Sequence, residues 1–221
     1  RAQAAHQGIT KLFEERGTVL LHGVTSSGKT EIYIHLMKEQ MEQGRQVLYM
    51  LPEIALTTQI IERLRRHFGP AIGVFHSRLT PAARREVWKR VSEGSLRAVL
   101  GVRSSLFLPF SDLGLIIVDE EHDSSYKQYD PAPRYNARDT AIFLASMHGA
   151  KVLLGSATPS IESFYNASQG KYGLTTLSER FGGLLMPQIK LVNLKDEYRK
   201  KTMQSVFSSV LIREIEAALE A

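Results

Sequence analysis

The sequence of 221 residues contains no cysteine and only one tryptophan. Without cysteine, the chain can form neither a disulfide nor a cysteine-ligated zinc site. No apolar run approaches the roughly 20 residues of a membrane-spanning helix, and no signal peptide is visible. These features lead us to expect a cytoplasmic protein with no membrane partner. The chain begins with Arg1 rather than Met, so we expect it to be a piece of a longer protein.

Basic residues only slightly outnumber acidic ones, which gives a formal net charge of +5. This balance permits nucleic acid as a partner but does not require it. The densest basic groups are 63–67 and 84–90. Both fall on expected helices, where a solvated face is the simpler interpretation.

Continuous apolar runs predict strands, at 18–21, 47–51, 72–75, 97–101, 113–118 and 151–154. Between them, helical patterns cover 2–15, 31–44, 57–68, a segment starting at Thr80-Pro81, 138–147 and 160–168. Strands that are apolar throughout and alternate with helices are typical of a parallel sheet covered on both faces. We therefore expect an α/β domain with a mostly parallel sheet. On the helix after Thr80, we expect Val87, Trp88 and Val91 in the core, and we expect the Thr158-Pro159 turn to cap the helix at 160–168.

The pattern weakens after Tyr172. Short strands are expected at 173–177 and 189–193, with loops at Gly182-Gly183 and Pro187. Residues 196–203 are charged and are interpreted as a linker. The last helix, 208–221, has an apolar stripe. We expect it to be loosely held, as the start of a second domain.

The clearest motif is the stretch 23–30, GVTSSGKT, which fits G-x-x-x-x-G-K-[ST] between an expected strand and an expected helix. In such a loop, backbone N–H groups and the helix N-terminus bind phosphate oxygens. We expect Lys29 to reach the β- and γ-phosphates and Thr30 to ligate Mg²⁺. The remaining phosphate-binding candidates are Gly23, Thr25, Ser26, Ser27 and Gly28. A surface Gly/Ser loop is the alternative.

Acidic residues follow the apolar strand 115–118. Ligands bind at the carboxyl ends of strands in α/β sheets, which is where Asp119 falls. We expect Asp119 to hold Mg²⁺, directly or through water, and Glu120 to polarise the attacking water. The adjacent second acid favours hydrolysis of a nucleoside triphosphate over phosphoryl transfer. Two acids that only begin a loop are the alternative.

The sequence Asp119-Glu120-Glu121-His122 is followed by 155–158, GSAT, after another strand–helix unit. This pair of motifs resembles the superfamily 2 helicases and translocases. The resemblance implies that His122 couples the ATP site to Ser156 and Thr158.

Longer strings narrow the resemblance to the bacterial primosomal helicases, which restart replication. They include GVTSSGKTEIY (23–33), LPEIALTTQ (51–59), FHS (75–77), GVRSSLFLPFSDLGLIIVDEEHDSSYKQ (101–128), PRYNARDTA (133–141) and GSATPSIES (155–163).

This resemblance implies a RecA-like P-loop NTPase lobe over residues 1–197, with 198–221 as a linker and the first helix of a truncated second lobe. It implies an ATP-dependent 3′-to-5′ DNA helicase of replication restart and primosome assembly, with ATP and Mg²⁺ as cofactors. The implied partners are forked or single-stranded DNA, primosome proteins and single-strand-binding protein. Zinc is expected only in the second half of such helicases, which also supplies an arginine to the ATP site. We therefore expect weak ATP turnover from this chain.

The resemblance also implies DNA contacts in the loops after strands, at Thr57, His76, Ser77, Arg103 and Ser104. For Arg103, a structural ion pair is the alternative.

An aromatic-rich loop of such helicases corresponds to Tyr126, Lys127, Tyr129 and Arg134, which suit base stacking and phosphate attraction. Tyrosines that pack on the domain surface are the alternative. Gln3 is expected to read adenine.

Two other functions stay open at this point. One is a P-loop NTPase that does not act on nucleic acid, and the other is an inert nucleotide-binding fragment.

Overall fold

The computed structural model describes residues 2–180 and 189–220, and the chain divides into two units, Arg1–Gly183 and Leu184–Ala221. The first unit contains a seven-stranded sheet in the order β3-β4-β2-β5-β6-β1-β7, and its strand pairs are all parallel. The strands are β1 (Thr18–Gly23), β2 (Gln46–Met50), β3 (Ile72–Phe75), β4 (Ala98–Gly101), β5 (Leu113–Asp119), β6 (Lys151–Ser156) and β7 (Gly173–Leu177). The expected parallel α/β fold is confirmed.

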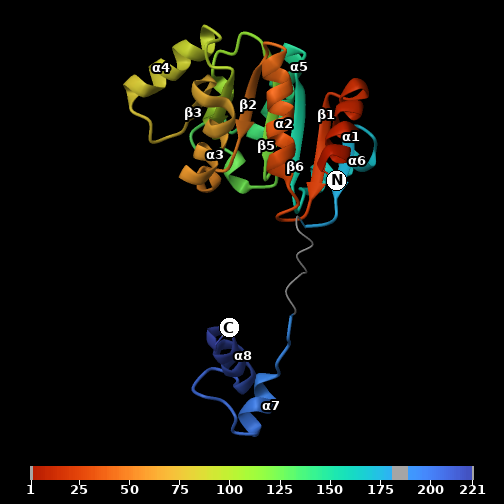
Figure 1. Cartoon of the computed structure of the whole chain (residues 1–221), viewed down its shortest axis with the longest axis vertical. Helices are drawn as coiled ribbons and strands as arrows, with labels where there is room; N and C mark the ends of the chain where they lie inside the picture. Colours follow the sequence, from red (N-terminus) through yellow and green to blue (C-terminus); the bar gives the residue numbers. More distant parts are fainter. Residues whose placement is uncertain (1, 181–188, 221) are drawn as a thin grey trace. The chain divides into compact units, whose positions relative to one another are not determined.

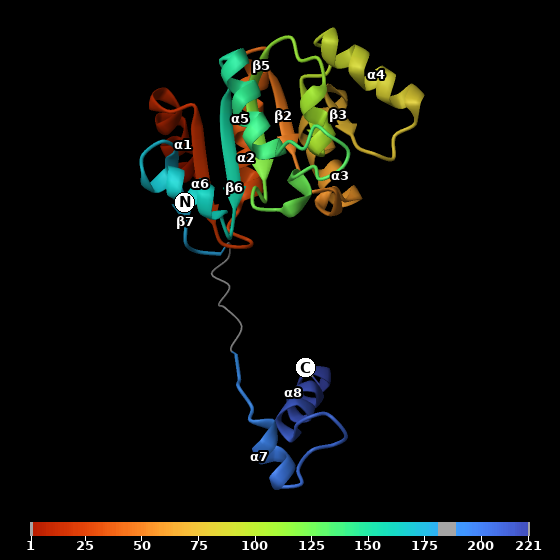
Figure 2. The ribbon, with the colours of Figure 1, turned by 180° about the vertical axis from the view of Figure 1, so that it is seen from behind.

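Helices cover both faces of this sheet, as Figures 1 and 2 show from opposite sides. Successive strand residues point to opposite faces, so Leu21 packs in one apolar core and Leu20 in the other. One core includes residues of α1 (Ala2–Glu15), α2 (Lys29–Glu42) and α3 (Thr58–Phe68). The other includes residues of α4 (Pro81–Ser92), α5 (Ala137–His148) and α6 (Ile161–Ser168).

Because all the strands are parallel, their carboxyl ends lie along one edge of the sheet. The phosphate loop follows β1, Asp119 ends β5 and Ser156 ends β6. The loops after β2, β3 and β4 lie along the other half of that edge. The fold therefore brings the nucleotide candidates and the DNA candidates to neighbouring parts of one edge.

Two helix starts were predicted from side-chain capping, and one of them needs correction. Thr80 caps α4 as expected, because its hydroxyl oxygen accepts from the Ala83 N–H at 3.2 Å. For α6, the expectation of a cap at Thr158-Pro159 is wrong. Ser160 is the cap, and its hydroxyl oxygen accepts from the Ser163 N–H at 3.2 Å.

Trp88 is a second correction, because its side chain is 51% exposed rather than in the core. Val91 is buried and Val87 packs against the core. Successive residues of a helix are about 100° apart around its axis. The face of α4 that carries both valines therefore turns Trp88 toward solvent.

The second unit contains α7 (Leu194–Arg199) and α8 (Ser209–Glu220). The linker expected at 196–203 is wrong in its first half, because α7 begins after Asn193, whose side-chain oxygen accepts from the Lys195 N–H at 3.1 Å. The strand expected at 189–193 is also wrong, because those residues are irregular. The carboxylate of Glu197 on α7 accepts from the Ser209 hydroxyl at 2.6 Å, at the start of α8.

The expected domain boundary at residue 197 falls inside α7, and how firmly α8 is held stays a prediction. The loops expected at Gly182-Gly183 and Pro187 lie outside the described residues. Among the helices that the structure describes, none is long and apolar enough to span a membrane.

Candidate nucleotide site and nucleic-acid interface

The phosphate loop is shaped by backbone that only certain residues adopt. Gly28 has φ +89° and Ser26 has φ +60°, in the left-handed region that favours glycine. A Cβ at Gly23 would lie 2.8 Å from the Ser27 hydroxyl oxygen, so a larger residue at position 23 would force the Ser27 side chain to shift. Lys29 is buried, and its Nζ donates to the Gly23 carbonyl at 2.8 Å.

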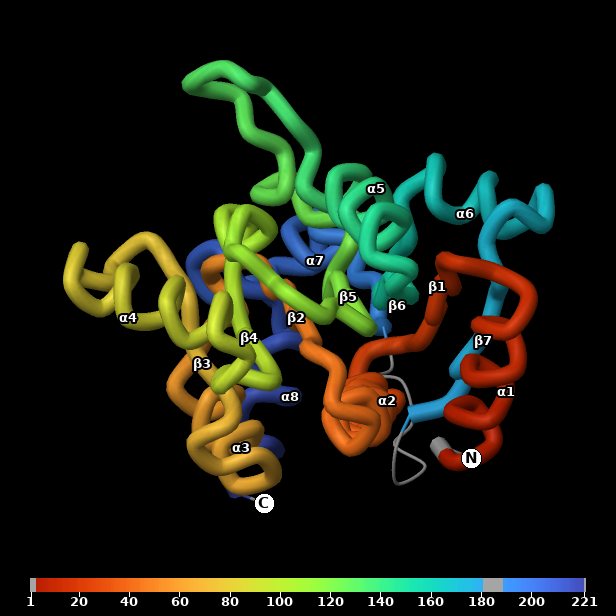
Figure 3. The backbone as a smooth tube through the Cα atoms, turned by 90° about the horizontal axis from the view of Figure 1, so that it is seen from above, coloured from red at the N-terminus to blue at the C-terminus, as the bar shows by residue number. Residues whose placement is uncertain are grey.

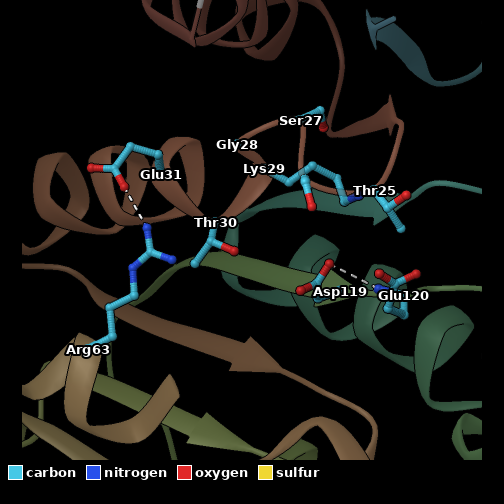
Figure 4. A pocket seen from close by; sticks show the side chains of 10 residues that line it. Thr25, Ser27, Gly28, Lys29, Thr30, Glu31, Arg63, Asp119 and Glu120 are labelled. Carbon is cyan, nitrogen blue, oxygen red and sulfur yellow. Dashed lines mark hydrogen bonds and ion pairs between the residues drawn. The ribbon is translucent and has the colours of Figure 1, made fainter. Parts of the chain in front are cut away.

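A pocket of about 640 Å³ opens beside this loop, within the usual size range of small-molecule sites. Figure 4 shows the side chains that line it, which converge from α2, α3 and the end of β5. Its lining residues are Thr25, Ser26, Ser27, Gly28, Lys29, Thr30, Glu31, Arg63, Asp119 and Glu120. The structure therefore brings together both candidate acids and the phosphate-loop candidates other than Gly23, which is not among the lining residues.

The donor set of this pocket fits a nucleotide phosphate and Mg²⁺. The Ser27 hydroxyl oxygen is buried and has no hydrogen-bond partner among the described residues, so it is free to bind a phosphate oxygen. The hydroxyl of Thr30 and the carboxylate of Asp119 are oxygen ligands of the kind that Mg²⁺ prefers. Lys29 supplies a positive charge at the helix N-terminus.

Asp119 ends β5 and is held by two tyrosines that the sequence analysis missed. The Tyr33 hydroxyl donates to Asp119 Oδ1 at 2.9 Å, and the Tyr49 hydroxyl donates to Oδ2 at 3.2 Å. Burial raises the pKa of Asp119 above its ordinary value, and the hydrogen bond from Tyr33 opposes that rise. Burial and the charge of Asp119 both raise the pKa of Tyr33 and of Tyr49, so these phenols stay protonated donors.

Glu120 lines the pocket and has a left-handed backbone, at φ +47°. Its N–H donates to Asp119 Oδ1 at 3.1 Å (Figure 4). A non-glycine residue held in this region costs on the order of 1–3 kcal/mol, and such residues cluster at functional sites.

The three coupling candidates meet beside the pocket. His122 Nδ1 lies 2.8 Å from the Ser156 hydroxyl oxygen, and His122 Nε2 lies 3.4 Å from the Thr158 hydroxyl oxygen. The Thr158 N–H donates to the same Ser156 oxygen at 3.0 Å. The loop after β5 is thus bonded to the end of β6 and the loop after it, and the coupling role of these residues stays a prediction.

Glu121 is a further residue that sequence reasoning missed. Its buried carboxylate accepts from the Ser160 N–H at 2.7 Å, from the Ser163 hydroxyl at 2.8 Å and from Arg138 Nη1 at 3.2 Å. Burial alone lowers the pKa of Arg138, but the hydrogen bond that it donates to Asp139 and the charges of Asp139 and Glu121 raise it overall. This network ties the acidic motif to α5 and to the start of α6.

The sequence places Arg63 in a basic group for which a solvated helix face is the simpler interpretation. In the structure, Arg63 lines the nucleotide pocket. Its Nη2 donates to Glu31 Oε2 at 2.8 Å (Figure 4). The two residues lie on α3 and α2, so only the packing of these helices reveals the pair.

The DNA candidates divide between two places. Ser77, Arg103 and Ser104 line a second pocket, of about 380 Å³, after β3 and β4. Thr57 caps α3, accepting from the Ile60 N–H at 3.5 Å, and His76 lines a different pocket, beside β3.

Arg103 Nη1 donates to the backbone carbonyls of Ser125 and Lys127 at 3.1 and 2.9 Å. Its guanidinium therefore holds the loop after β5. This is a structural role, as in the alternative given above, but through backbone carbonyls rather than an ion pair.

The prediction that Tyr126 stacks on a base is wrong for this structure. Its ring is 1% exposed, and its hydroxyl donates to the Asp119 carbonyl at 2.7 Å. Tyr129 is 67% exposed, and Arg134 and Lys127 each donate to backbone carbonyls within the same loop. Figure 3 shows this loop, in green between β5 and α5, extending beyond the neighbouring helices.

Gln3 lies on the exposed side of α1 and is not among the residues that line the nucleotide pocket. Its adenine-reading role stays a prediction.

A parallel sheet whose first strand leads into a phosphate loop, with an acid at the end of a neighbouring central strand, defines a RecA-like P-loop NTPase lobe. The model of the DEAD/DEAH box helicase family matches residues 3–166, and the chain belongs to this family.

The resemblance to the primosomal helicases is also confirmed. The chain is 45% identical to "Replication restart protein PriA" of Chlamydia pneumoniae over 203 residues, which are 92% of this chain and 27% of that protein. It is 41% identical to the protein of the same name from Bacillus subtilis (strain 168) over 206 residues, 93% of this chain and 25% of that protein. The chain thus spans about a quarter of the length of these relatives.

Solved structures agree on the fold. RecG bound to a three-way DNA junction matches 82% of this chain and 24% of its own, with a TM-score of 0.60 and 24% identity. The helicase MrfA bound to DNA matches 81% of this chain and 25% of its own, with a TM-score of 0.56 and 18% identity.

Proposed function

We propose that this chain is the first motor lobe of an ATP-dependent 3′-to-5′ DNA helicase that acts in replication restart and primosome assembly. One observation supports the proposal most directly. Lys29 and Asp119 line one pocket, and His122, three residues after Asp119, is hydrogen-bonded to Ser156 at the end of the neighbouring strand β6. The 41–45% identity to replication restart proteins supports the biological process.

In this proposal, the backbone of the phosphate loop and Lys29 bind the phosphates of ATP. Thr30 and Asp119 hold Mg²⁺, which neutralises charge on the phosphate oxygens when it is bound. Glu120 orients the attacking water, and its place among the residues that line the pocket suits this role. The lysine ammonium exchanges the Gly23 carbonyl for a phosphate oxygen.

DNA is proposed to lie along the other half of the edge, over Ser77, Arg103 and Ser104. Tyr129 and Arg134 offer an exposed ring and a cation on the projecting loop. Forked or single-stranded DNA is the proposed substrate, and the DNA-bound structures of RecG and MrfA support it. Primosome proteins and single-strand-binding protein in the cytoplasm are the proposed partners.

We also propose that this chain hydrolyses ATP slowly. The arginine that completes such sites comes from a second lobe in the resembling helicases. Loss of an arginine of this kind costs roughly 10³-fold or more in rate.

The test is ATP turnover by the 221-residue chain with and without single-stranded DNA, beside Lys29→Ala. Slow turnover together with nucleotide binding that requires Lys29 supports the proposal. Fast turnover that DNA leaves unchanged would favour an NTPase that does not act on nucleic acid. Absence of nucleotide binding would favour an inert fragment.

A further inference from the structure

Three buried tyrosines from separate segments converge on Asp119. Tyr33 comes from α2, Tyr49 from β2 and Tyr126 from the loop after β5, and each is at most 1% exposed. Tyr33 and Tyr49 each donate to one carboxylate oxygen, while Tyr126 donates to the backbone carbonyl. The rings of Tyr33 and Tyr49 also contact each other edge to face, with centroids 5.4 Å apart.

Gly155 provides a second, independent observation. It lies on β6 directly opposite Asp119 in the sheet register. A Cβ at this position would lie 1.8 Å from the Tyr33 hydroxyl oxygen. The absence of a side chain at residue 155 is therefore what lets the Tyr33 hydroxyl reach the carboxylate.

These contacts limit how Asp119 can meet a metal. An ionised carboxylate has about four acceptor positions, two on each oxygen. Oδ1 accepts from both the Tyr33 hydroxyl and the Glu120 N–H, and Oδ2 accepts from the Tyr49 hydroxyl. One position on Oδ2 is left, which suits a single metal–oxygen bond or one metal-bound water and does not suit bidentate ligation.

We propose that Tyr33 and Tyr49 are positioning residues that orient the Asp119 carboxylate for the Mg²⁺ of a bound nucleotide. The inference rests on the proposed function and deepens it. Partners that hydrogen-bond a metal ligand fix its orientation, and their removal typically lowers metal affinity by about 10–100-fold. Removing one hydroxyl at a time lets the carboxylate rotate without taking away its charge.

The experiment measures binding of a fluorescent ADP to the 221-residue chain, in EDTA and across a Mg²⁺ titration. The variants are Tyr33→Phe, Tyr49→Phe and the double substitution, and Tyr165→Phe, at a tyrosine 62% exposed on α6, is the control. For the double variant, we expect the Mg²⁺ concentration that gives half-maximal tightening to rise about 10-fold or more, with affinity in EDTA unchanged. Each single variant should shift less, and Tyr165→Phe should not shift.

An unshifted Mg²⁺ midpoint in the double variant would overturn the proposal. Equal losses of affinity in EDTA and in Mg²⁺ would overturn it too, because a purely structural role weakens both alike. If the double variant unfolds, which circular dichroism would show, the single variants decide the matter by the same criterion. A wild-type chain whose nucleotide binding ignores Mg²⁺ would overturn the proposed function together with this inference, whereas a normal wild type with unshifted variants overturns this inference alone.

Discussion

The two halves of the sheet's carboxyl edge are built differently. Around the ends of β1, β5 and β6, polar side chains are bonded to one another across the fold, as Tyr33 is to Asp119 and His122 to Ser156. Around the ends of β3 and β4, the candidates are partly or fully exposed. There Arg103 donates to backbone carbonyls, and the Ser77 hydroxyl donates to the Glu53 carboxylate at the surface. We call the region at the ends of β1, β5 and β6 the nucleotide half, and the region at the ends of β3 and β4 the DNA half. In the nucleotide half, the side chains are held in position before a ligand binds. In the DNA half, hydrogen-bond donors remain at the surface.

This difference predicts two signatures for substitutions. A change in the nucleotide half should alter stability or nucleotide binding in the absence of DNA. A change in the DNA half should leave both nearly unchanged and weaken DNA binding. Tyr126 lies between the halves, because its loop is held by Arg103 and its hydroxyl by Asp119.

The largest effect should come from Glu121→Ala. Removing this carboxylate takes from Arg138 its buried carboxylate partner, leaving the more exposed Asp139, and leaves the Ser160 N–H without its acceptor. Breaking one side of a buried ion pair costs about 3–5 kcal/mol of unfolding free energy. Urea unfolding measures it, with Glu120→Ala next to it as the more exposed control. A loss no larger than that of Glu120→Ala would remove the case for a tightly bonded nucleotide half.

Lys29→Ala should have the next largest effect, on nucleotide affinity. Charged hydrogen bonds contribute about 1.5–3 kcal/mol each, so we expect affinity to fall on the order of 100-fold. Isothermal titration with ADP and Mg²⁺ measures it. Lys127→Ala, on the projecting loop, is the matched lysine control and should leave nucleotide affinity unchanged. An equal loss of affinity in both variants would contradict the division of the edge into a nucleotide half and a DNA half.

Tyr129→Ala tests the DNA half. Stacking of one base on an aromatic ring is worth about 1–3 kcal/mol, so binding of single-stranded DNA should weaken by about 10-fold in fluorescence anisotropy. Tyr165→Ala, at another exposed tyrosine, is the control. Nucleotide affinity and melting temperature should stay the same, and a change in either would show that this loop belongs to the nucleotide half.

Asp119→Asn should give the smallest effect, an increase in stability. Burial raises the pKa of Asp119 in the folded state above the unfolded value of 3.8. The folded state thus binds this proton more tightly, and stability falls as pH rises through the interval between the two values. In metal-free buffer, the variant should melt a few degrees higher than the wild type at pH 7, with the gain shrinking toward pH 4. Melting curves across that range measure it, and a gain that grows toward low pH would contradict the burial of an ionised carboxylate.

The parts of the site that the sequence predicted are those that depend on local backbone. The loop 23–30 and the acids after β5 follow directly from a strand and a turn, and the structure brings them to one pocket. Tyr33, Tyr49 and Glu121 were missed because their roles depend on strand register and helix packing. No sequence pattern shows that Tyr33 passes over Gly155 to reach Asp119.

The wrong predictions have the same origin. Tyr126 lies in an aromatic, basic segment that suits DNA contact, yet the path of its loop turns the ring inward. Residues 189–193 include three apolar side chains, as a short strand would, but Ile189 and Leu191 are 86% and 94% exposed and pair with no strand among the described residues. Burial of one apolar face is what usually stabilises such a strand.

The central claim is that the nucleotide half is complete enough to bind its ligand without DNA. The most direct test is calorimetric titration of the 221-residue chain with ADP and Mg²⁺ in the absence of DNA, and again with single-stranded DNA present. The account predicts binding that depends on Lys29 and Mg²⁺ in both conditions. Binding that is seen only with DNA, or that Lys29→Ala leaves unchanged, would contradict it.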